Sequence, residues 1–108
     1  MNKFPDDEIG DALYQFQKNG FDISKPMEID FFVAIPSEKN GIQVSAEIKK
    51  HGFNVSIEKD NESGEWTCYC AKTLVPEYSE MARIEKELDD LAKLYGGYAD
   101  GFGSYGNS

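Results

Sequence analysis

The chain has 108 residues, of which 40% are hydrophobic and 13% aromatic, so it can bury one core without disulfide bonds or metal ions. Its 11 basic and 20 acidic residues give a net charge of −9, which repels the phosphates of nucleic acids and attracts cationic partners. Because no apolar run suits a membrane span and no secretory signal is evident, we expect one cytoplasmic domain over residues 1–108, binding neither membranes nor nucleic acid.

The N-terminal segment predicts a helix over residues 5–20. Pro5 suits the first turn of a helix, and the carboxylates that follow it favour the positive end of the helix dipole. Apolar residues then recur on one face, at Ile9, Ala12, Leu13 and Phe16. The dipole explains the acidic cluster at the helix start, and a docking site for a cationic partner is the alternative.

A central strand is predicted over residues 27–35, because β-branched and aromatic residues alternate there before Pro36. Ser37 can cap a second helix, which ends near His51 and Gly52. We expect His51 to lie near the negative end of this helix's dipole. A catalytic role is not expected for it, because no nucleophile is paired with it.

Two more strands follow, over residues 53–58 and 65–74, joined by a turn-rich loop at residues 60–64. Cys68 and Cys70 lie two apart in the second of these strands, so they share a face and cannot bond to each other. The chain has one histidine and two cysteines, too few for a zinc site of the usual kind. We expect two buried cysteines and no metal or cofactor.

A long helix is predicted from Glu77 to Tyr95, because apolar residues recur there at three- and four-residue steps. After it, Gly101, Gly103 and Gly106 match the G-x-G-x-x-G motif of dinucleotide sites. That motif requires a helix directly after it, and only two residues follow the last glycine. We therefore expect a final β-strand of alternating aromatic and small residues.

The predicted order after residue 26 is strand, helix, strand, strand, helix, strand, the split βαβ pattern of ferredoxin-like folds. We therefore expect an α+β fold with a βαββαβ core over residues 27–105, and an extra N-terminal helix. The core would be a four-stranded antiparallel sheet with helices on one face.

Phe32 and Tyr69 are expected side by side on the sheet face without helices. Exposed aromatic residues on such a sheet stack bases in RNA-recognition modules, so a ligand- or single-stranded-RNA-binding sheet is one hypothesis. Asp30 and Glu58 are predicted on the same face, and their negative charges argue against RNA binding there. The alternatives are a protein-binding surface, or an aromatic patch covered by the N-terminal helix or by a second copy.

The long helix carries the other candidate partner-binding residues. Glu80, Glu87 and Asp90 share one side of it, whereas Asp89 and Lys93 form an i,i+4 pair on another flank. A solvated helix face accounts for this pattern, and a docking surface for a cationic partner is the alternative. The sequence offers no constellation of nucleophile, metal or cofactor, so we expect no enzyme.

Three blocks of sequence, in this order, resemble the regulator of ribonuclease activity B (RraB) family of protein inhibitors of the endoribonuclease RNase E. They are Ser24 to Phe32, Gly64-Glu65-Trp66 running to Leu74-Val75-Pro76, and Tyr95 to Gly103. The resemblance implies a ferredoxin-like regulator without catalytic activity. It also implies binding to the basic, disordered scaffold region of RNase E and an effect on RNA decay.

Overall fold

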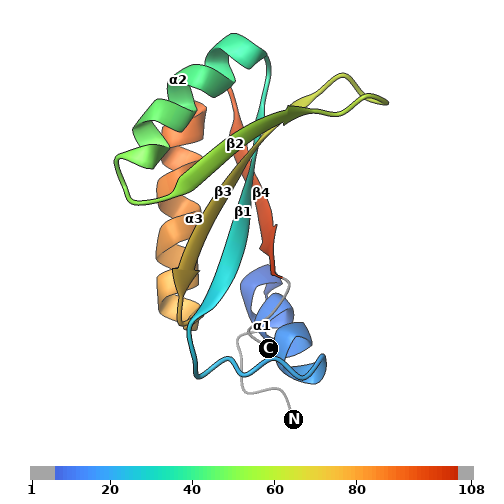
Figure 1. Cartoon of the computed structure of the whole chain (residues 1–108), viewed down its shortest axis with the longest axis vertical. Helices are drawn as coiled ribbons and strands as arrows, with labels where there is room; N and C mark the ends of the chain where they lie inside the picture. The colour runs from blue at the N-terminus through green and yellow to red at the C-terminus, as the bar shows by residue number, and fades with distance from the viewer. Residues whose placement is uncertain (1–6, 105–108) are drawn as a thin grey trace.

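The computed structural model describes residues 7–104, and these form three helices and a four-stranded antiparallel sheet (Figure 1). In chain order the elements are α1 (Glu8–Lys18), β1 (Met27–Ile35), α2 (Glu38–Lys49), β2 (Asn54–Lys59), β3 (Trp66–Leu74), α3 (Tyr78–Lys93) and β4 (Tyr98–Gly103). This order confirms the expected α+β fold. Pro5 and Gly106 lie outside the described residues. Within those residues, no helix is long and apolar enough to cross a membrane.

The strands follow the order β2-β3-β1-β4 across the sheet, and each neighbouring pair is antiparallel. This order is compatible with the predicted split βαβ arrangement. Helix α2 packs against β2 and β3, and helix α3 packs against β1 and β4. Figure 1 shows both helices on the same side of the sheet, so the opposite side is called the open face below.

The core lies between the sheet and these two helices, as the alternation in β1 predicts. Residues Met27, Ile29, Phe31, Val33 and Ile35 of β1 are buried. The predicted stripe of α3 meets them through Met81, Ile84 and Leu88.

Cys68 and Cys70 are unpaired and fully buried, as the sequence predicts. Burial raises the pKa of the Cys68 thiol to about 11 and that of Cys70 to about 12. Both thiols are therefore protonated at neutral pH, which leaves them unreactive as nucleophiles.

Helix α1 begins at Glu8, where Asp7 caps it by accepting a hydrogen bond from the Gly10 N–H at 2.8 Å. Its Phe16 ring lies 6.0 Å from that of Phe102, which pairs with Phe31 on the helix-covered side of the sheet. Figure 1 shows α1 beside the end of β4. This placement contradicts the alternative in which the N-terminal helix covers the aromatic residues of the open face.

Candidate protein-binding surfaces

The three candidate carboxylates of α3 all have a cation beside them on the same helix. Arg83 pairs with Glu80, and it also donates to Glu87 Oε2 at 2.9 Å. Lys86 Nζ lies 3.2 Å from Asp90 Oδ2. The hydrogen bond from Arg83 is the main cause that lowers the pKa of Glu80. This side of α3 therefore presents paired charges instead of an uncompensated acidic patch.

The other flank of α3 is connected to the sheet by Asp89. Its Oδ2 pairs with Lys93 Nζ at 2.7 Å, which confirms the predicted i,i+4 pair, and its Oδ1 accepts from the Ala99 N–H of β4 at 2.9 Å. The bond from Lys93, followed by that from Ala99, lowers the pKa of Asp89. Asp89 thus serves the packing of α3 on β4, a role that the sequence pattern did not indicate.

His51 lies directly after the C-cap of α2, close to the predicted position at the end of that helix. Its Nδ1 is 2.7 Å from Glu87 Oε1, a contact between the turn after α2 and helix α3 that sequence reasoning missed. Glu87 therefore faces both His51 and Arg83, so it is the most fully partnered of the three candidate carboxylates.

The open face brings Phe32 and Tyr69 together, as predicted. They are direct cross-strand partners of β1 and β3, and their ring centroids lie 5.7 Å apart with an interplanar angle of 80°. Both side chains are half-buried. They line a hollow of about 320 Å³ together with Asp30, Gly103 and Ser104.

Sequence reasoning missed Gly103 and Ser104 as lining residues, because a register shift between β1 and β4 brings them there. Between Phe31 and Val33 the pairing slips, so that both Ala99 and Phe102 oppose residues of the core face. Gly101 adopts a φ of +94° at this point, a left-handed conformation that glycine tolerates best. As a result, Gly103, which follows Phe102, faces the hollow.

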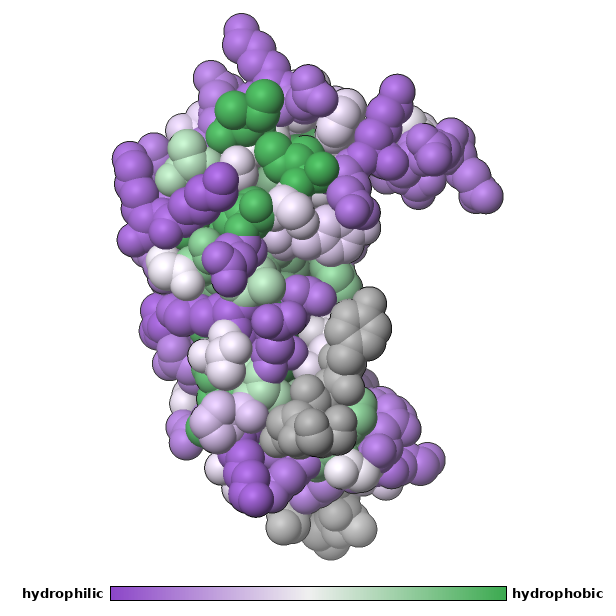
Figure 2. Space-filling view, viewed as in Figure 1, coloured by the Kyte–Doolittle hydropathy of each residue, from purple (hydrophilic) through white to green (hydrophobic). Residues whose placement is uncertain are grey.

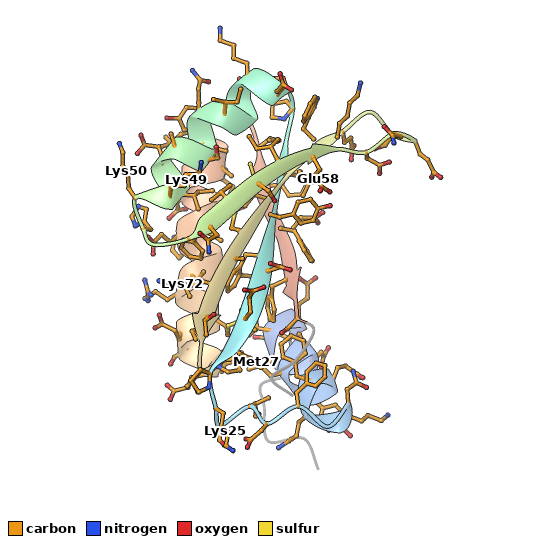
Figure 3. All side chains as sticks on the ribbon, in the orientation of Figure 1. Lys25, Met27, Lys49, Lys50, Glu58 and Lys72 are labelled. Atoms are coloured by element: carbon orange, nitrogen blue, oxygen red, sulfur yellow. The ribbon has the colours of Figure 1, made fainter. Side chains whose placement is uncertain are left out.

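The open face also carries carboxylates that have no cation beside them. Within residues 7–104, no lysine or arginine forms an ion pair with Glu28, Asp30 or Glu58. Figure 3 shows Lys49, Lys50 and Lys72 on the side of the sheet where α2 and α3 lie, away from Glu58. These three carboxylates of the open face therefore keep a negative charge that no described lysine or arginine compensates.

The described surface has two other hollows, one beside Pro36 and Tyr98 and the other beside Glu85 and Asp89. Figure 2 shows a mostly hydrophilic surface, with hydrophobic residues gathered around α2, where Ile42 is 57% exposed. In the part of the chain that the structure describes, no three His, Cys, Asp or Glu side chains come together as metal ligands would.

Comparison with known proteins identifies the family. The sequence matches the family described as RraB, regulator of ribonuclease activity B, over residues 6–104. No curated protein matches it significantly. The family match includes every helix and strand described above, and it confirms the resemblance seen in the three sequence blocks. The chain therefore belongs to the regulator of ribonuclease activity B family.

Proposed function

We propose that this protein is a cytoplasmic, single-domain, non-catalytic regulator of an RNase E-type endoribonuclease. It binds the basic, disordered scaffold region of that enzyme and thereby slows RNA decay. The observation that carries the proposal is the family match over residues 6–104, because the family is described as a regulator of ribonuclease activity.

The net charge of −9 supports a basic partner. An arginine-rich segment of low hydrophobicity stays disordered on its own, and a negative protein field raises the rate at which such a segment associates. Exposed charges interact within a screening length of about 10 Å at 0.1 M salt. Binding of this kind weakens as salt is added.

The two candidate surfaces contribute differently to this binding. Exposed ion pairs such as Lys86 with Asp90 are each worth only about 0–1 kcal/mol, so a scaffold arginine can compete for the carboxylates of α3. Asp30 and Glu58 on the open face need no such exchange, because no ion pair involves them within residues 7–104. We therefore assign the open face the larger share of the contact.

A second candidate function is binding of single-stranded RNA on the open face. The perpendicular contact of Phe32 with Tyr69 favours it, because exposed aromatic rings can stack bases. The carboxylates of Glu28, Asp30 and Glu58 on the same face repel the backbone phosphates of a bound RNA. An unmodified protein that fails to shift RNA in a gel would eliminate this candidate.

A titration against the isolated scaffold segment of RNase E tests the leading proposal. We expect binding at about 50 mM salt that weakens at least about tenfold at about 500 mM, because screening removes the charge attraction. The control is the same segment with glutamine at each arginine position, which should bind much more weakly. Absence of association at the lower salt concentration would contradict the proposal.

A further inference from the structure

The hollow on the open face combines two aromatic rings with one carboxylate. The rings of Phe32 and Tyr69 stand at 80° to each other, so together they form a corner. Gly103 adds no side chain to this corner; a Cβ at that position would contact Phe32 Cζ at 3.5 Å and fill part of the space. The volume of about 320 Å³ admits a long side chain from a partner.

Asp30 supplies the charge of this hollow. Its cross-strand neighbours are Ala71 on β3 and Gly103 on β4, and neither has a side chain that could cover or neutralise the carboxylate. Among the described residues, no hydrogen bond or ion pair involves the side chain of Asp30. A half-buried carboxylate without an ion pair thus lies next to two half-buried aromatic rings.

The charge around the hollow selects a cation. By register, the positions that β1, β2 and β3 turn to the open face include no lysine or arginine: Glu28, Asp30, Phe32 and Ala34; Asn54, Ser56 and Glu58; Thr67, Tyr69, Ala71 and Thr73. A second copy docking through this face would bring carboxylates against carboxylates. A nucleotide would bring its phosphate to the same group of carboxylates.

We propose that this hollow binds one arginine side chain of a basic partner segment. The guanidinium stacks on the ring of Phe32 or Tyr69 and donates two hydrogen bonds to the carboxylate of Asp30. Arginine fits better than lysine, because its planar, weakly hydrated group can stack and donate in pairs at once. The inference rests on the proposed function, in which the partner is a basic segment of a ribonuclease.

Two synthetic peptides of equal length and charge test this inference, one with arginine and the other with lysine at the same positions. Dissociation constants are measured by calorimetry at low salt for the unmodified protein, Asp30→Asn and Glu28→Gln. Glu28→Gln is the matched control, because it removes the same charge from the same face of β1, two residues away from the hollow.

We expect the arginine peptide to bind at least about tenfold more tightly than the lysine peptide. Asp30→Asn should weaken arginine binding about tenfold and abolish the preference, whereas Glu28→Gln should change it less than about threefold. Phe32→Leu, which keeps an apolar side chain, should also reduce the preference. Equal affinities for the two peptides, or equal effects of the two charge variants, would overturn the inference.

The scaffold segment of RNase E, titrated in parallel, separates this inference from the proposed function. If unmodified protein and Asp30→Asn bind the segment equally, the arginine site is wrong and the proposed function stands. If the protein prefers the arginine peptide but does not bind the segment, the proposed function is wrong and the site stands. Loss of a dimer in Phe32→Leu would identify a second copy as the occupant and overturn the inference.

Discussion

Replacing Gly97 by alanine is expected to destabilise the protein by more than about 3 kcal/mol. A Cβ at this position would lie 2.2 Å from the carbonyl oxygen of Ala34 and 3.2 Å from Ile35 Cγ2. The obstacle is backbone of β1, which pairs with β3 and β4 on its two sides and so cannot move away. The free energy of unfolding, measured by urea denaturation, checks the prediction.

Gly103→Ala is the matched control, at the end of the strand β4 that directly follows Gly97. A Cβ there would meet Phe32 Cζ at 3.5 Å, an ordinary van der Waals distance. We expect its free energy of unfolding to stay within about 1 kcal/mol of that of the unmodified protein. If the Gly97 variant unfolded at the same urea concentration as this control, the close approach of Gly97, just before β4, to the end of β1 would be wrong.

Phe31→Ala is expected to cost about 3–5 kcal/mol, the usual range for deleting a buried aromatic side chain. The residue is 1% exposed. Its ring centroid lies 5.7 Å from that of Phe102 and 6.1 Å from that of Phe53, so it connects β1 with β4 and with the segment before β2. Urea denaturation again gives the free energy of unfolding.

The neighbouring variant Phe32→Ala should cost less than about half as much, because its side chain is half-buried on the open face. This pair of adjacent substitutions tests which face of β1 carries the core. Equal losses of stability for the two variants would show that the faces have been misassigned.

The sequence predicted the order and type of the elements because their signals are local. Alternation in β1 and the apolar stripe of α3 each lie within one segment, and both match the buried residues. The contact of Phe32 with Tyr69 was also predictable, since it follows from two alternating strands that pair as neighbours.

The shape of β4 was harder to predict from the sequence, because strict alternation places Tyr98 and Phe102 on the same face. The register shift at Gly101 turns Phe102 to the core, whereas Tyr98 pairs with Ala34 on the open side. The sequence likewise did not predict on which side of the sheet α1 packs, because nothing in the residues of α1 shows that Phe16 contacts Phe102.

The candidate site was predictable only in part, for a similar reason. The ion pairs within α3 follow from i,i+4 spacing. The contacts of His51 with Glu87 and of Asp89 with the Ala99 N–H join separate elements, and no spacing rule covers them. The structure therefore changes the ranking of the candidates: Glu80, Glu87 and Asp90 of α3 have cations beside them, whereas no ion pair within residues 7–104 involves the carboxylates of the open face.

The rate at which RNase E cleaves RNA, measured with increasing amounts of this protein, tests the central claim most directly. The full-length enzyme should be compared with a form that lacks its basic scaffold region. The account predicts that only the full-length enzyme is slowed and that the protein alone leaves the RNA intact and unbound. Equal slowing of both forms, or cleavage or binding of RNA by the protein itself, would contradict it.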